Sequence, residues 1–153
     1  MAKTAIGVIF ANMHDENVPE LVRRRTMASI PYGGRYRLID FALSNLVNAG
    51  ITTVGVVTKY NYQSLLDHLG SGKEWDLARK DGGIVLLPPF IDETDSPYNN
   101  RLEALKGITG FLSRRNEEYV VLSDCDAIAH IDIDDIIAYH ESKNADITMV
   151  FHE

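Results

Sequence analysis

The sequence predicts an α/β fold: a mostly parallel, doubly wound (Rossmann-like) sheet with helices on both faces. Three observations support the sheet and its helices. Short β-branched runs alternate with segments whose apolar residues recur at helical spacing. The length of 153 residues suits one domain with a sizeable core, and no repeat or linker divides it. Since crossovers between neighbouring strands are right-handed, this alternation favours parallel strands.

Each element is expected from its own local pattern. Apolar, β-branched runs typical of buried strands occupy residues 5–10, 51–58, 84–87, 118–122 and 146–151. Helical periodicity occupies residues 37–48, 61–69, 102–116 and 133–143. Tyr32-Gly33-Gly34 predicts a turn, and Gly50 follows the first helix, at a position where helix ends favour glycine.

Composition restricts the possible partners. The net charge of −7 disfavours nucleic acid and anionic membranes, which both attract basic surfaces. No apolar run approaches the roughly 20 residues that a membrane span needs. Cys125 is the only cysteine, so no intrachain disulfide can form, and a cytoplasmic location is expected. We expect its thiol to be packed rather than nucleophilic.

Ligands of open α/β sheets bind beyond the carboxyl ends of the strands, here residues 11–16, 58–62, 88–90 and 123–126. The first of these segments has no glycine and contains Asp15 and Glu16. A phosphate cradle needs close backbone approach, which glycine permits, so this loop should repel a triphosphate. An exposed acidic loop is expected instead.

Two carboxylates follow the fourth strand. Asp124 and Asp126 could hold Mg²⁺ together with substrate phosphates, although acidic turns are also common on surfaces. Asp132 or Asp134 is expected to cap the next helix. The histidines, His14 among them, are scattered without the spacing of metal ligands.

A longer motif begins at Tyr32. The run YGGRYRLIDFALSNLVNAGI resembles the segment F-G-G-[KR]-[FY]-R-[IL]-I-D-F-x-L-S-N-x-x-[NH]-[SA]-G-I of the glucose-1-phosphate adenylyltransferases (ADP-glucose pyrophosphorylases). VLLPPF at residues 85–90 and the strand at residues 119–124 are also similar to family segments. The resemblance implies that residues 1–153 are the N-terminal part of a nucleotidyltransferase-like domain. The remaining domain and a C-terminal left-handed β-helix are expected in a complete subunit.

The chain departs from the family where nucleotide chemistry is expected. The family's G-G-x-G-x-R-L loop falls on residues 12–18, and its R-x-K-P-A element on residues 25–29. The substituted positions are Asn12, Met13 and Asp15 for three glycines, Asn17 for the catalytic arginine, Met27 for the lysine, and Phe90 for the glutamine that reads adenine.

Two further family motifs are altered. G-T-A-D-A falls on residues 100–104, so Arg101 stands where the family has threonine. A-G-D-H falls on residues 124–127, so Asp124 replaces alanine, whereas Asp126 keeps the metal-ligand aspartate. The resemblance therefore implies Mg²⁺ as a possible cofactor on Asp126.

These losses resemble the regulatory (GlgD-type) subunit of bacterial ADP-glucose pyrophosphorylases. The expected function is a non-catalytic or weakly active subunit of glycogen biosynthesis that pairs with a catalytic subunit. Arg35 lies where the family has a lysine associated with sugar-phosphate effectors, so Arg35 and Arg37 are candidate effector residues; solvated arginines are the alternative. Two other functions stay open: an active adenylyltransferase that makes ADP-glucose and pyrophosphate from ATP and glucose 1-phosphate, and a degenerate sugar-phosphate or nucleotide sensor.

Overall fold

A parallel four-stranded sheet forms the centre of the chain. The structure, a computed structural model, describes residues 4–89 and 98–151. The strand order is β5-β4-β1-β6, and every neighbouring pair is parallel. The strands are β1 (Ala5–Phe10), β4 (Thr53–Val57), β5 (Gly83–Leu87) and β6 (Tyr119–Asp124). A small antiparallel hairpin, β2 (Pro31–Tyr32) and β3 (Tyr36–Arg37), stands apart from this sheet.

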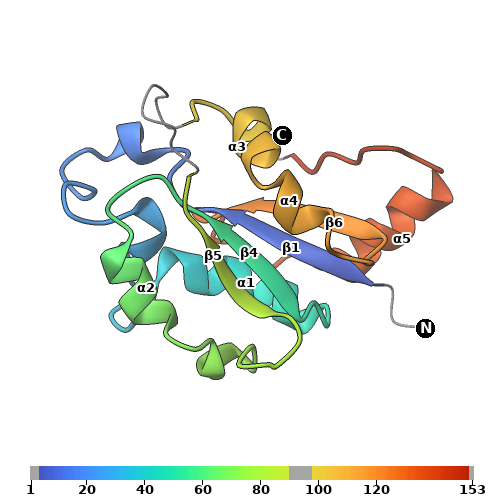
Figure 1. Cartoon of the computed structure of the whole chain (residues 1–153), viewed down its shortest axis with the longest axis horizontal. Coiled ribbons are helices and arrows are strands. Elements are labelled where there is room, and N and C mark those ends of the chain that lie inside the picture. Colours follow the sequence, from blue (N-terminus) through green and yellow to red (C-terminus); the bar gives the residue numbers. More distant parts are fainter. Residues whose placement is uncertain (1–3, 90–97, 152–153) are drawn as a thin grey trace.

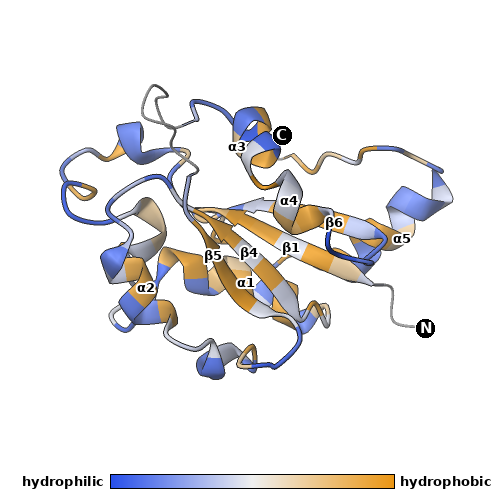
Figure 2. Ribbon diagram, in the orientation of Figure 1, coloured by the Kyte–Doolittle hydropathy of each residue, from blue (hydrophilic) through white to orange (hydrophobic). Residues whose placement is uncertain are grey.

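Burial explains why the most apolar strands are central. Every residue of β1 and β4 is buried, and the two strands pair in register from Gly7 with Val54 to Phe10 with Val57. Their orange colour in Figure 2 runs along the middle of the sheet. Strand β6 lies at one edge, and its Val120 and Leu122 are exposed.

Helices cover both faces of the sheet, as the sequence predicts (Figure 1). The first face packs against α1 (Leu38–Asn48), α2 (Gln63–Leu69) and α5 (Ile133–Ser142). The second packs against α3 (Arg101–Gly107) and α4 (Thr109–Leu112). Short 3₁₀ turns lie at η1 (Asp15–Asn17), η2 (Met27–Ser29) and η3 (Lys73–Trp75).

The start of α1 is held by the side chain of Asp40 in its first turn. The Arg37 backbone N–H donates to Asp40 Oδ2 at 2.9 Å, and Asp40 Oδ1 lies 2.6 Å from His68 Nε2 of α2. Gly33 and Gly34 adopt φ angles of 62° and 86° in the hairpin turn, which confirms the turn predicted there. Figure 1 shows α1 lying along the sheet directly after this hairpin.

Two predicted elements differ in the structure. The helix expected at residues 102–116 is divided at Ile108 into α3 and α4. Gly107 and Gly110 flank the break, where their low helix propensity weakens a continuous helix.

No helix in the described part of the chain is long and apolar enough to cross a bilayer.

The strand predicted at residues 146–151 is wrong. This segment has no regular structure, and Ile147 and Phe151 are 85% and 74% exposed. A strand is stabilised by hydrogen bonds to a neighbouring strand and by packing on one of its faces. Among the described residues this segment pairs with no strand, so its β-branched composition alone does not produce one.

The strand order reverses between β1 and β6. From β1 the chain adds β4 and β5 on one side, and it then returns to place β6 on the other. At the carboxyl ends, the Cys125 N–H donates to the Phe10 carbonyl at 3.2 Å. The loop after β1 and the turn after β6 therefore meet at the topological switch point, where sheets of this kind bind ligands.

Candidate functional site

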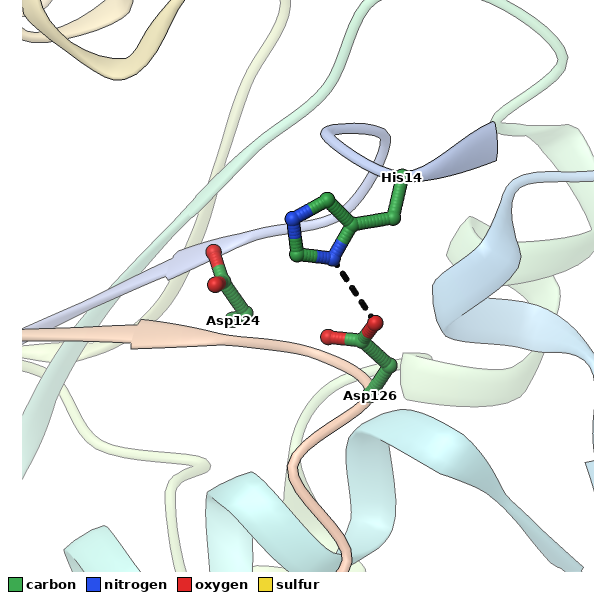
Figure 3. A group of neighbouring side chains, drawn as sticks. All are labelled: His14, Asp124 and Asp126. Atoms are coloured by element: carbon green, nitrogen blue, oxygen red, sulfur yellow. Dashed lines mark hydrogen bonds and ion pairs between the residues drawn. The ribbon is translucent and has the colours of Figure 1, made fainter. Parts of the chain in front are cut away.

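Three side chains that could hold a metal meet at this switch point. His14 comes from the loop after β1, Asp124 is the last residue of β6, and Asp126 follows two residues later. His14 Nδ1 lies 2.8 Å from Asp126 Oδ2, and one ligand atom from each of the three lies within 4.8 Å of the others. Figure 3 shows the imidazole directed toward Asp126, with the Asp124 carboxylate close by.

Arg101, the first residue of α3, joins this group. Its Nε donates to Asp124 Oδ1 at 3.1 Å and its Nη2 to Asp124 Oδ2 at 2.5 Å. The same Nη2 lies 3.1 Å from His14 Nε2. Because a guanidinium only donates, Nε2 accepts, and His14 Nδ1 carries the proton that it donates to Asp126. The hydrogen bond to Asp124 raises the pKa of Arg101, and the charges of Asp124 and Asp126 add to the effect.

As they are arranged, the side chains of His14, Asp124 and Asp126 do not fit Mg²⁺ as metal ligands. Mg²⁺ prefers oxygen ligands in near-octahedral geometry. Here one of the three ligands is an imidazole, and both oxygens of Asp124 already accept hydrogen bonds from Arg101. A guanidinium in contact with two of the three side chains also opposes a second cation electrostatically.

The loop after β1 is closed by its own hydrogen bonds. Asn12 Nδ2 donates to Asp15 Oδ2 at 2.7 Å, and the Met27 N–H donates to Asp15 Oδ1 at 3.2 Å. Asn12 Oδ1 accepts from the Lys59 N–H at 3.0 Å, which ties the loop to the end of β4. Backbone amides of the loop bond within it as well, from Asn17 to the His14 carbonyl and from Val18 to the Asp15 carbonyl.

The expectation of an exposed acidic loop is therefore wrong for its central residue. Asp15 is only 4% exposed and Asn12 only 3%, whereas Glu16 and Asn17 are exposed. The buried carboxylate accepts hydrogen bonds from donors on both sides, which offsets the cost of removing it from water. In this loop the Asp15 carboxylate accepts from one backbone N–H and one side-chain amide, groups of the kind that bind phosphate in other loops.

The substituted family positions occupy different environments. Met27, the first residue of η2, is buried in the core, and Met13 is half-buried against the second face of the sheet. The segment containing Phe90 lies outside the described residues, so its predicted role in base recognition stays a prediction.

The two candidate effector arginines differ in their contacts. Arg35 is exposed in the hairpin turn, with its guanidinium carbon 5.6 Å from the centre of the Tyr36 ring. Arg37 Nη1 donates to Ser64 Oγ at 2.7 Å and to the carbonyls of Ser29 and Ser64. Arg37 thus joins β3 to η2 and α2, whereas the Arg35 side chain extends from the surface.

Two smaller predictions are confirmed. Asp132 caps α5, because its Oδ1 accepts from the Asp135 N–H at 3.1 Å. Cys125 is buried, and burial raises the pKa of its thiol, with the charges of Asp126, Asp124 and Asp15 adding to the shift. The thiol is packed against the Ala11 carbonyl, at an Sγ–oxygen distance of 3.6 Å.

Sequence reasoning missed the roles of His14 and Arg101. In the sequence His14 is one of several scattered histidines, although its loop and residues 123–126 both follow predicted strands. Knowing that β1 and β6 are neighbours is what brings the two segments together. No local pattern indicates the contact of Arg101 with Asp124, which lies 23 residues further along the chain.

Comparison with known proteins agrees with this architecture. A family model described as "Nucleotidyl transferase" matches residues 18–153, beginning at the last residue of the altered loop. The chain belongs to the nucleotidyl transferase family. Glucose-1-phosphate adenylyltransferase of Clostridium acetobutylicum is 38% identical over 152 residues, covering 99% of this chain and 40% of that protein. Glycogen biosynthesis protein GlgD of Bacillus subtilis is 36% identical over 149 residues, covering 97% of this chain and 43% of that protein.

The fold is also similar to that of a solved structure whose sequence is much less similar. A crystal structure of a putative glucose-1-phosphate thymidylyltransferase from Bacillus anthracis superposes with a TM-score of 0.68 at 19% identity, covering 90% of this chain and 50% of that one. The chain therefore has the nucleotidyltransferase-like fold that its sequence predicts. It spans less than half the length of the two curated relatives, which include both the adenylyltransferase and the GlgD type.

Proposed function

We propose that this chain belongs to a regulatory subunit of glucose-1-phosphate adenylyltransferase, non-catalytic or weakly active, that acts in glycogen biosynthesis with a catalytic partner. The observation that carries the proposal is the closed loop at residues 12–18. Its central carboxylate, Asp15, accepts hydrogen bonds from Asn12 and from the Met27 backbone. A phosphate-binding loop leaves its donors free for the anion, whereas here the Asn12 amide and the Met27 N–H already donate to the buried carboxylate of Asp15.

The charge balance supports the same conclusion. Attack of a sugar phosphate on a nucleotide α-phosphate depends on cations and positioned donors that neutralise the developing charge. Asn17 and Met27 stand where the resemblance places the family's catalytic arginine and lysine. The guanidinium of Arg101 contacts His14 of the loop after β1, but this cation is already paired with Asp124. Loss of one preorganised donor costs about 10²–10³ in rate, so several losses together should leave little turnover.

The proposed partner follows from the relatives. Proteins similar to this chain carry both names, glucose-1-phosphate adenylyltransferase and glycogen biosynthesis protein GlgD. A subunit that keeps the scaffold and lacks turnover would act by assembling with a catalytic subunit. We further propose that the exposed Arg35 contributes to the binding of a sugar-phosphate effector in that assembly.

A reconstitution assay tests the proposal. The full-length subunit is assayed for pyrophosphate release from ATP and glucose 1-phosphate, alone and after mixing with the catalytic subunit. We expect negligible release alone, co-elution of the two subunits, and a changed effector response of the mixture. A matched control replaces the subunit with a second portion of catalytic subunit.

The same assay decides the main alternative, an active adenylyltransferase. What favours that alternative is Asp126, which the resemblance gives as the retained metal-ligand aspartate and which lies at the switch point. Robust turnover by the isolated subunit would rule out the regulatory proposal. Failure to associate with any catalytic subunit, together with retained ligand binding, would favour a sugar-phosphate or nucleotide sensor.

A further inference from the structure

Two departures of this chain from its family contact each other directly. Arg101 falls where the resemblance places a threonine of the G-T-A-D-A motif, and Asp124 falls where it places the alanine two residues before the metal-ligand aspartate. In the structure the Arg101 guanidinium donates to both oxygens of Asp124, from Nε at 3.1 Å and from Nη2. One substitution adds a cation and the other adds the anion that binds it. This geometry is the bidentate arginine–carboxylate pair, the strongest of the common ion-pair arrangements.

The same guanidinium reaches the retained aspartate through His14. Arg101 Nη2 donates to His14 Nε2 at 3.1 Å, and His14 Nδ1 donates to Asp126 Oδ2 at 2.8 Å. Asp124 is thus neutralised directly, and Asp126 accepts a hydrogen bond oriented by the same cation. The four residues join the loop after β1, the end of β6 and the first turn of α3 across the switch point.

We propose that Arg101 takes the place of the divalent cation at this site, so that the switch point of this chain is neutralised from within and does not bind Mg²⁺ or Mn²⁺. Asp124 and Asp126 are about as close as metal ligands would be, since they and His14 offer ligand atoms within 4.8 Å of one another. What separates them from a metal site is the guanidinium, which holds Asp124 and His14. The inference stands apart from the proposed regulatory role, because it concerns ion binding by this chain alone.

Thermal unfolding of the full chain with and without about 10 mM MnCl₂ or MgCl₂ tests the inference. A ligand that binds only the folded state raises its melting temperature by mass action. For the unchanged chain we expect a shift below about 1 °C. For Arg101→Met, which frees His14, Asp124 and Asp126, we expect Mn²⁺ to raise the melting temperature by about 3 °C or more relative to the same variant without metal.

Three further variants make the result specific. Arg79→Met removes an exposed pair with Asp76 away from the site, and it should stay insensitive to Mn²⁺. Arg101→Lys keeps a cation and should also stay insensitive. Adding Asp126→Asn to Arg101→Met should abolish the gained shift. A variant Arg101→Met that gains no Mn²⁺ response would overturn the inference, because the carboxylates would then not form a metal site even when free.

Direct Mn²⁺ binding keeps the inference testable if Arg101→Met does not fold. Electron paramagnetic resonance of the unchanged chain counts bound Mn²⁺, and we expect no stoichiometric binding at about 1 mM metal. Stoichiometric binding that Asp126→Asn removes would show that a metal occupies the site beside Arg101, and it would overturn the inference. Pyrophosphate release plays no part in either measurement, so the two proposals fail separately.

Discussion

Residues 32–50 and residues 12–18 both contain buried polar side chains, yet they relate to the family in opposite ways. The first region matches the family motif and uses its polar groups to hold the scaffold: Asp40 caps α1 and bonds His68, and Arg37 bonds Ser64. The second has lost the family's glycines and still satisfies its polar groups, through Asn12 and Asp15. The motif that identifies the family therefore stabilises the fold, whereas the divergent loop changes the residues at the place where nucleotide chemistry is expected.

This comparison also shows how the altered loop is tolerated. A loop that merely lost its glycines would leave backbone and side-chain polar groups buried and unpaired, at a cost of about 1–3 kcal/mol each. Here the substitutions are mutually compatible, since the Asp15 carboxylate accepts from Asn12 and from Met27. The loop is therefore held by hydrogen bonds of its own where the family has glycines.

The largest effect is expected for Leu46→Ala in the matching region. Leu46 is completely buried, and its Cδ1 would lie 2.7 Å from a Cβ at Gly7 of β1, so α1 packs closely on the sheet here. We expect unfolding free energy to fall by about 2–5 kcal/mol in urea denaturation. Leu21→Ala, at a side chain 54% exposed, is the control and should change little. A loss below about 1 kcal/mol for Leu46→Ala would show that this contact is not tightly packed.

A smaller effect is expected for Asp15→Ala in the divergent loop. The substitution leaves Asn12 Nδ2 and the Met27 N–H without their acceptor, so we expect a loss of about 1–3 kcal/mol. Glu16→Ala, at the exposed neighbour, should stay within about 0.5 kcal/mol. Equal values for the two variants would mean that the loop network contributes nothing to stability, and the contrast between the regions would lose its basis.

Arginine substitutions in the hairpin sharpen the comparison within the matching region. Arg37→Ala removes donors to Ser29 and Ser64 and should cost about 1–2 kcal/mol, whereas Arg35→Ala should stay within about 0.5 kcal/mol. In the complex with a catalytic subunit, Arg35→Ala should weaken the apparent affinity for a sugar-phosphate effector. Unchanged activation and unchanged affinity in that complex would refute the effector role of Arg35.

The labelling rate of the Cys125 thiol measures how readily the switch point opens, and it requires no mutation. The Cys125 thiol is 2% exposed, and burial raises its pKa, so it should stay a protonated thiol inside the fold. At pH 8 a disulfide reagent should react at least about 100-fold more slowly with the native chain than with the chain in denaturant, because reaction requires local opening. Rapid labelling of the native chain would show that the ends of β1 and β6 open readily.

Much of the fold could be predicted from local patterns. The buried strands and α1 follow from runs of β-branched residues and from periodic apolar positions, both of which depend on neighbours a few residues away. The segment at residues 146–151 shows the limit: Ile147 and Val150 favour a strand, yet among the described residues no partner strand pairs with them. A strand needs hydrogen bonds from elsewhere in the chain, and composition does not supply them.

The amino-acid sequence by itself determined the fold class, the family resemblance and the positions at which the family's glycines and cations are replaced. Only the tertiary structure decided which contacts the replacing residues make. The contacts of Asp15 with Met27, of His14 with Asp126, and of Arg101 with Asp124 join residues 12, 112 and 23 positions apart. Such pairs depend on the order of strands in the sheet, because that order selects which strand ends become neighbours at the switch point.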